Sequence, residues 1–249
     1  MITARRILAL VLLLVAPTLV VAAGGGPKLE SVSIDISNQA SLQRGAKYFV
    51  NYCLGCHSAQ YVRYNTLGSG LGLSEDQVVK NLMFTGDRPS DTMAIAMPPG
   101  DAAVWFGRTP PDLSLVARAR GTDWIYAFLK SFYANPDKPS GADNLILEGA
   151  SMPPVLWDLQ GIQKAVFHEE TDALGYSHKI FDRFEIVSPG KLSEEEFDEV
   201  VVDLVAFLSY ISEPVQLERR SLGIKVILFL VIFLLFSYAL KKEIWKDVN

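Results

Sequence analysis

The sequence predicts a mainly α-helical domain followed by one C-terminal transmembrane helix. Apolar residues recur at helical spacing along much of the chain, whereas few segments show the alternation that is typical of strands. Residues 222–240 are almost entirely apolar, with Lys225 as their one charge. A chain of 249 residues with a net charge of −5 has room for one globular domain and its membrane segments.

Four segments of the domain carry helix-start signals followed by apolar residues at helical spacing. The expected helices begin at Ser41, Ser74, Thr122 and Ser193. Ser74 with Gln77 and Ser193 with Glu196 each form a capping box, and the helix at Ser193 is the strongest case because a long apolar series at helical spacing follows it. Pro214 is then expected to break the chain before the membrane span, since proline cannot continue a helix.

Residues 1–23 resemble a secretory signal peptide. They have a positively charged start, an apolar centre over 7–15 and small residues around Ala23. The alternative is an N-terminal membrane anchor, which Pro17 and the glycines at 24–26 disfavour. Export of the chain is therefore expected.

Residues 221–241 are expected to form the membrane span. The segment is long enough to cross about 30 Å of hydrocarbon as a helix, and it has no polar face that would suit a buried soluble helix. Because the N-terminus is exported, residues 24–220 should lie on the outer side and residues 242–249 in the cytoplasm. The lysines that follow the span favour the same orientation.

The exported body is acidic. The chain has 23 Lys and Arg against 28 Asp and Glu, and most of the basic residues outside positions 24–220 flank the membrane segments. Such a charge argues against a nucleic-acid partner and fits the steering of a basic protein partner. Simple solubility explains the same charge equally well.

The most specific motif is Cys53-Leu54-Gly55-Cys56-His57, which contains the only two cysteines of the chain. This C-x-x-C-H pattern predicts one covalently attached c-type haem. Cys53 and Cys56 can bond the two vinyl groups of one porphyrin, and His57 is then placed as an iron ligand. The alternatives are a thioredoxin-like redox pair, which does not need the histidine, and a structural zinc, which needs four suitably spaced ligands.

The iron requires a second axial ligand on the opposite haem face. His168 and His178 stand in polar contexts and are expected to be exposed loop residues. A methionine ligand raises the reduction potential, as suits an electron carrier. Met97 and Met152 are each followed by two prolines, which stiffen a loop. The residues alone leave both methionines open.

Several further motifs stand in a fixed order around the C-x-x-C-H pentad. They are Arg44-Gly45, Tyr61-Val62-Arg63-Tyr64, Pro110-Pro111-Asp112-Leu113-Ser114, Arg118-Ala119-Arg120-Gly121, Met152-Pro153-Pro154 and Arg219-Arg220-Ser221-Leu222-Gly223. With them the chain is similar, nearly end to end, to the cytochrome c1 family, the haem-bearing subunit of the respiratory cytochrome bc1 complex. The resemblance implies a class I-like cytochrome c domain with inserted loops.

The resemblance also implies roles for individual residues. It points to Met152 as the partner of His57 on the iron, although this chain has Ser151-Met152-Pro153-Pro154 where many relatives have Met-Ala-Pro-Pro. It implies that Arg120 meets a haem propionate and that Pro111 packs near the ring. Tryptophans 105, 124 and 157 are expected in the core.

The function implied is electron transfer within a bacterial ubiquinol:cytochrome c oxidoreductase (complex III) of the inner membrane. The chain would take one electron from a Rieske iron–sulfur protein and pass it to cytochrome c, beside cytochrome b in a dimeric complex. It would itself be non-catalytic. Two alternatives stay open: an independent membrane-anchored cytochrome c that feeds a terminal oxidase, and a haem enzyme such as a peroxidase with an open axial position.

Overall fold

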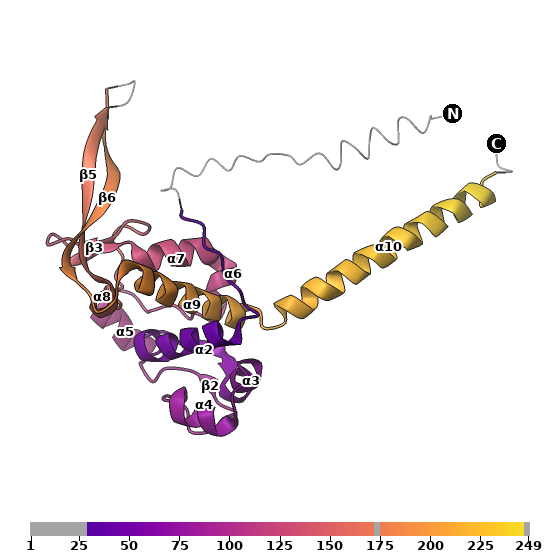
Figure 1. Cartoon of the computed structure of the whole chain (residues 1–249), viewed down its shortest axis with the longest axis horizontal. Coiled ribbons are helices and arrows are strands. Elements are labelled where there is room, and N and C mark those ends of the chain that lie inside the picture. The colour runs from indigo at the N-terminus through magenta and orange to yellow at the C-terminus, as the bar shows by residue number, and fades with distance from the viewer. Residues whose placement is uncertain (1–28, 172–174, 247–249) are drawn as a thin grey trace.

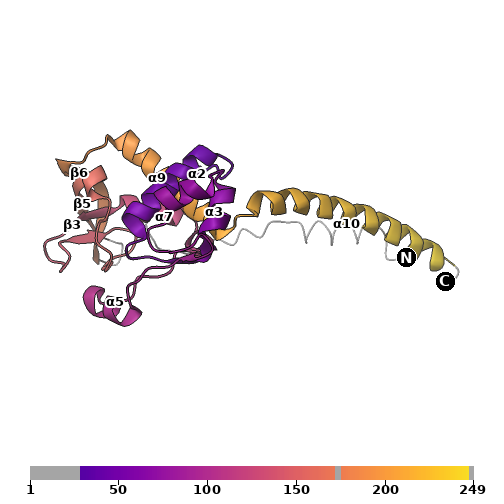
Figure 2. The ribbon, with the colours of Figure 1, turned by 90° about the horizontal axis from the view of Figure 1, so that it is seen from below.

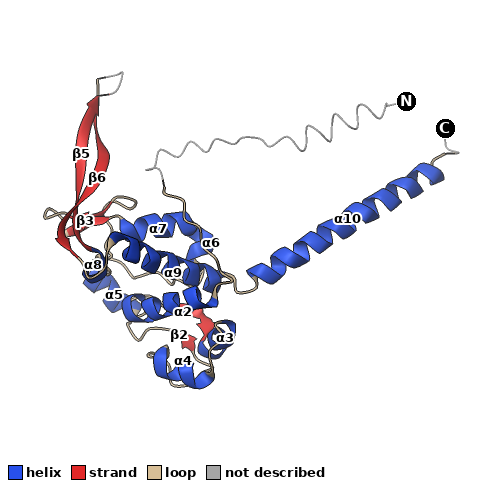
Figure 3. Cartoon of the chain, in the orientation of Figure 1, coloured by secondary structure: helices blue, strands red, loops and turns tan. Residues whose placement is uncertain are grey.

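A computed structural model describes residues 29–171 and 175–246, so the expected signal peptide lies outside the described residues. Helices dominate the described chain, which confirms the predicted fold class (Figures 1 and 3). The helices are α2 (Gln39–Tyr48), the π-helical turn η1 (Phe49–Cys53), α3 (Tyr64–Gly70), α4 (Glu75–Asn81), α5 (Pro99–Phe106), α6 (Val116–Arg120), α7 (Thr122–Lys130), α8 (Trp157–Gln160), α9 (Glu194–Ser212) and α10 (Gln216–Ile244). The strands are β1 (Ala59–Arg63), β2 (Thr92–Met93), β3 (Phe132–Ala134), β4 (Ala142–Asn144), β5 (Gly161–Thr171) and β6 (Ser177–Pro189).

Three of the four predicted helix starts agree with the structure. Both capping boxes form, at Ser74 before α4 and at Ser193 before α9, and α7 begins at Thr122. The prediction of Ser41 as a cap was wrong. Asn38 caps α2 instead, because its side-chain oxygen accepts a hydrogen bond from the Ser41 backbone N–H at 3.2 Å.

The core is built around the crossing of α2 and α9, which lie side by side (Figure 1). Phe49 and Phe207 are fully buried there, with ring centroids 5.4 Å apart. Asp203 on α9 is also buried, and it accepts hydrogen bonds from the Ser41 hydroxyl at 2.6 Å and from the Arg44 guanidinium at 2.9 Å. The helix that leads into the C-x-x-C-H motif is thus fixed on the longest helix of the domain.

A long antiparallel hairpin, β5 with β6, projects from the helical body (Figure 1). The sequence predicted few strands, and this element was missed. The pairing contains register shifts at 162/163 and 166/167, which interrupt the alternation of apolar and polar residues. His168 and His178 are exposed as expected, but they lie on the strands rather than in loops.

The chain breaks between α9 and α10, around Pro214, as predicted. Within the described residues, α10 is the one helix long and apolar enough to cross a membrane, and none of its apolar window is buried. It extends away from the domain in both views (Figures 1 and 2). At its start, Glu213 pairs with Arg219 and with Arg118 of α6 at 3.2 Å, so the junction is tied to the domain.

Candidate haem-binding site

The two thiols lie on one tight turn at the end of η1. The backbone N–H groups of Cys56 and His57 both donate to the carbonyl of Cys53, at 3.0 and 2.8 Å. Cys53 is buried, Cys56 is half-buried and both are free. The turn therefore presents two unoxidised thiols beside one imidazole, as attachment of a single porphyrin requires.

The environment of Cys53 argues against a redox role for the pair. Burial, together with the nearby Cys56, raises the pKa of the Cys53 thiol to about 12. Thiol–disulfide catalysis depends on a thiolate, and thus on a lowered pKa. A structural zinc lacks a ligand set as well, because no three His, Cys, Asp or Glu side chains converge anywhere in the described part of the chain.

His57 is held in the orientation that an iron ligand needs. Its Nδ1 lies 2.7 Å from the carbonyl oxygen of Pro111. A carbonyl can only accept, so Nδ1 carries the proton and Nε2 keeps its lone pair for a metal. Burial lowers the pKa of His57, against the opposing effects of the Pro111 carbonyl and Asp112, which favours the neutral imidazole.

The segment 111–114 also fastens the chain that follows His57. Asp112 accepts a hydrogen bond from the Gln60 backbone N–H at 2.9 Å. The Ser114 hydroxyl accepts one from the Tyr61 backbone N–H at 3.1 Å. These roles of Asp112 and Ser114 were not predicted from the sequence. Asp and Ser side chains that follow a proline commonly accept hydrogen bonds from backbone N–H groups, so the pattern indicated that these two residues bind backbone. It did not indicate which backbone groups they bind.

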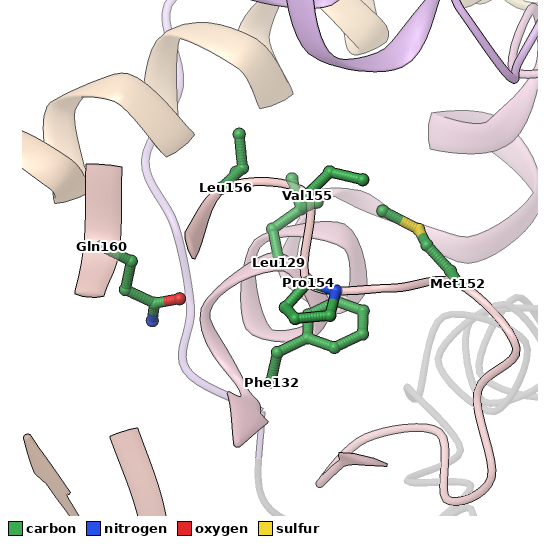
Figure 4. A pocket seen from close by; sticks show the side chains of 7 residues that line it. All are labelled: Leu129, Phe132, Met152, Pro154, Val155, Leu156 and Gln160. Carbon is green, nitrogen blue, oxygen red and sulfur yellow. The ribbon is translucent and has the colours of Figure 1, made fainter. Parts of the chain in front are cut away.

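The two candidate methionines differ in their surroundings. Met152 is partly buried against the hydrophobic core, on the loop between β4 and α8. Figure 4 shows its side chain at one end of a small hollow that Leu129, Phe132 and Pro154 also line. Met97 precedes α5, which stands apart from the rest of the domain (Figure 2), and it does not pack against the core. Packing against the core therefore favours Met152.

The start of the Met152 loop is fixed by a buried carboxylate. Asp143, only 1% exposed, accepts hydrogen bonds from the backbone N–H groups of Asn144 at 2.9 Å and Gly149 at 2.7 Å. Lys138 pairs with the same side chain at 3.1 Å. Residues 145–149 are thus folded back on Asp143, a constraint that was not predicted from the sequence.

Arg120 is exposed, and its guanidinium lies over the ring of Trp124 at 5.0 Å. It forms no ion pair within the described chain, so it is free to meet an anionic group. Trp124 is partly buried and stacks on Phe128 at 4.9 Å, as expected of a core residue. The same expectation was wrong for Trp105 and Trp157, which are 64% and 57% exposed.

Comparison with known proteins identifies the family. The model described as the Cytochrome C1 family matches residues 32–248. The chain belongs to the cytochrome c1 family. Members of this family carry a covalently bound c-type haem and serve as the haem-bearing electron-transfer subunit of the bc1 complex.

Individual relatives cover nearly the whole chain. Cytochrome c1 of Allochromatium vinosum is 47% identical over 98% of this chain and 100% of its own length. The ammonia monooxygenase gamma subunit of Nitrosomonas europaea is 42% identical over 96% of this chain and 97% of its own. Cytochrome c1 of Rhodospirillum rubrum is 30% identical over 85% of this chain and 83% of its own.

The described residues fit a haem c. They supply two free thiols on one turn, a neutral imidazole with Nε2 available, a partly buried thioether and an unpaired guanidinium. Cys53 and Cys56 would carry the porphyrin, His57 and Met152 would ligate the iron, and Arg120 would meet a propionate. Pro111 contributes through its carbonyl oxygen, a contact more specific than the expected packing against the ring.

The Asp143→Asn variant tests how the start of the Met152 loop is held. Burial alone would raise the pKa of Asp143, but the Asn144 and Gly149 donors and Lys138 outweigh it and leave the pKa below its usual value. The charged form therefore stabilises the fold above about pH 4, and this contribution is lost as pH falls through the folded-state pKa. We expect the variant to lose roughly 1.5 kcal/mol of unfolding free energy at pH 7, and less at pH 3, in urea titrations.

Asp76→Asn is the matched control, because Asp76 pairs with Lys80 at 2.6 Å on an exposed helix face. Exposed pairs of this kind contribute little. Equal losses in the two variants at pH 7 would mean that the buried carboxylate does not stabilise the loop.

Proposed function

We propose that this chain is the haem-bearing subunit of a bacterial cytochrome bc1 complex. It receives one electron from a Rieske iron–sulfur protein and passes it through haem c to a cytochrome c. It works beside cytochrome b in a dimeric assembly, and it makes and breaks no substrate bonds itself. The family assignment and the geometry around His57 support this proposal together.

The observation that carries the proposal is the hydrogen bond from His57 to Pro111 beside two free thiols. When an imidazole donates its Nδ1 proton to a carbonyl, as His57 does to Pro111, its Nε2 becomes a more basic metal ligand and the ring is fixed in orientation. The Met152 thioether would supply the second ligand to the iron and leave no open site for substrate chemistry. This arrangement favours electron transfer over a peroxidase-like activity.

When bound, the haem supplies a single redox step between ferric and ferrous iron. The residues of the chain contribute to that step by fixing the positions of the haem and of its iron ligands. Cys53 and Cys56 would hold the porphyrin on the η1 turn, and segment 111–114 keeps His57 in place through the Pro111, Asp112 and Ser114 contacts. A rigid set of ligands keeps the structural change between the two redox states small.

The membrane topology is part of the proposal. Residues 1–23 act as a signal peptide, residues 24–220 form the periplasmic domain, residues 221–241 cross the inner membrane once and residues 242–249 form a cytoplasmic tail. The exposed apolar surface of α10 supports a single span in contact with lipid. Lys241 and Lys242 at its end favour the cytoplasmic side.

A second candidate follows from the relative named ammonia monooxygenase gamma subunit, which is 42% identical. On that basis the chain would pass electrons within a monooxygenase assembly. An independent membrane-anchored cytochrome c is the third candidate. All three use the same haem site, so the partners discriminate between them.

The test is to purify the tagged chain from native membranes in a mild detergent and record its partners. We expect cytochrome b and an iron–sulfur protein to co-purify, and added quinol to reduce the c-type haem. A Cys53→Ala/Cys56→Ala variant should lose the covalent haem and this reduction. Isolation of the chain alone, with a functional haem, would favour an independent cytochrome, and recovery with monooxygenase subunits would favour the second candidate.

A further inference from the structure

One side-chain hydrogen bond joins the haem-attachment turn to the segment that carries the proposed methionine ligand. Tyr52, the residue before Cys53, donates its hydroxyl to the Asp158 carboxylate at 3.2 Å. Asp158 belongs to α8, the turn that directly follows the Met152 loop. Within the described chain, no other side-chain hydrogen bond connects residues 49–57 with residues 145–160.

Asp158 also contacts a residue beyond Tyr52, namely Lys191, which follows strand β6. The Lys191 ammonium lies 3.1 Å from the same carboxylate oxygen that Tyr52 contacts. The Lys191 backbone N–H donates to the carbonyl of Asp158 at 3.0 Å. Close packing also fixes α8, since a Cβ on Gly190 would come within 2.1 Å of the Leu159 carbonyl oxygen. The end of the Met152 loop is therefore anchored to the base of the hairpin as well as to Tyr52, through the same Asp158 oxygen.

The second carboxylate oxygen of Asp158, Oδ1, is buried and has no hydrogen-bond partner in the described chain. A buried oxygen that forgoes solvation costs free energy. The carboxylate is thus held through Oδ2 alone, which contacts both Tyr52 and Lys191. Isolated exceptions of this kind call for an explanation in terms of function or strain.

We propose that Tyr52, Asp158 and Lys191 form a brace that sets the position of Met152 relative to the haem-attachment turn, with Asp158 as its positioning residue. This inference rests on the proposed ligation by Met152. A bond between a thioether and iron is readily displaced. The fraction of molecules in which Met152 has left the iron therefore depends on how firmly its loop is held. Asp143 holds the start of the loop, and the brace holds its end.

Loss of the brace should raise the population of the open loop about fivefold, as expected for one hydrogen bond. The test uses the full haem-loaded chain in detergent, with the variants Tyr52→Phe and Asp158→Ala. Two quantities are measured: the rate at which carbon monoxide binds the ferrous form, and the pH at which the ferric sulfur–iron band disappears. We expect Tyr52→Phe to bind carbon monoxide roughly fivefold faster and to lose the band at a lower pH. Asp158→Ala also removes the Lys191 contact, so it should shift both quantities at least as far.

Tyr48→Phe is the matched control. It removes the same hydroxyl from a neighbouring ring, 6.4 Å away, that forms no hydrogen bond in the described chain. Its rate and its pH midpoint should equal those of the wild type. The double variant Tyr52→Phe/Asp158→Ala should resemble Asp158→Ala alone, because the two side chains act through one contact.

Two results would overturn the brace while ligation by Met152 stands. One is a Tyr52→Phe variant that matches Tyr48→Phe in both quantities. The other is a variant that unfolds more easily but keeps the wild-type rate and midpoint, since the bond would then be structural only. A sulfur–iron band that survives in Met152→Leu would instead overturn the ligand assignment, and the brace with it.

Discussion

Replacing Met152 with leucine is expected to abolish the weak sulfur–iron charge-transfer band of the ferric protein. Leucine keeps the volume and the apolar character of the side chain, so the loop should still pack against Leu129 and Phe132. The thioether is lost, however, and it is the donor that favours ferrous iron. We therefore expect the reduction potential to fall by on the order of 0.1 V or more. Carbon monoxide should bind the ferrous variant quickly, whereas the wild type should resist it.

Met97→Leu provides the matched control. Met97 is also followed by two prolines, but it precedes α5 and does not pack against the core. Its replacement should leave the optical band, the potential and the carbon monoxide reaction unchanged. Loss of the band in this variant, and not in Met152→Leu, would move the ligand to Met97 and contradict the assignment of the loop between β4 and α8.

The parts of the fold that were predicted correctly from the sequence depend on local patterns of residues. The C-x-x-C-H pentad and the capping boxes at Ser74 and Ser193 are each complete within one or two helical turns. The apolar run in α10 is longer, but it is one continuous segment of the chain. No tertiary contact is needed to recognise them, so one sequence suffices.

The parts that were missed depend on contacts between distant segments. The hydrogen bond between His57 and Pro111 joins residues 54 positions apart in the sequence, and the one between Tyr52 and Asp158 joins residues 106 positions apart. Met97 and Met152 share the same local pattern, so the residues alone could not separate them. The family resemblance pointed to Met152, and the packing of Met152 against the core supports that choice. The hairpin of β5 and β6 was overlooked because its bulges interrupt the alternation that marks a strand.

Gly45 shows how one such contact controls the site from a distance. At the crossing of α2 and α9, a Cβ added to Gly45 would lie 2.1 Å from the carbonyl oxygen of Asp203 and 2.7 Å from the Cβ of Phe207. Backbone on the opposite helix cannot move aside as a flexible side chain can. The helices could accept an alanine only by separating, which would also disturb the packing of Phe49 on Phe207.

We therefore expect Gly45→Ala to lower the free energy of unfolding by roughly 3 kcal/mol, at the upper end for overpacked cores. The corresponding drop in melting temperature is roughly 10 °C for a domain of this size. Gly100→Ala is the control, since a Cβ at Gly100 in α5 meets nothing within 4 Å and alanine favours a helix. Thermal unfolding of the two haem-loaded variants measures the difference.

Because α2 runs directly into η1 and Cys53, separation of the helices should also reduce the yield of covalent haem. A Gly45→Ala variant with wild-type stability and full haem content would mean that the α2–α9 crossing does not hold the attachment turn in place.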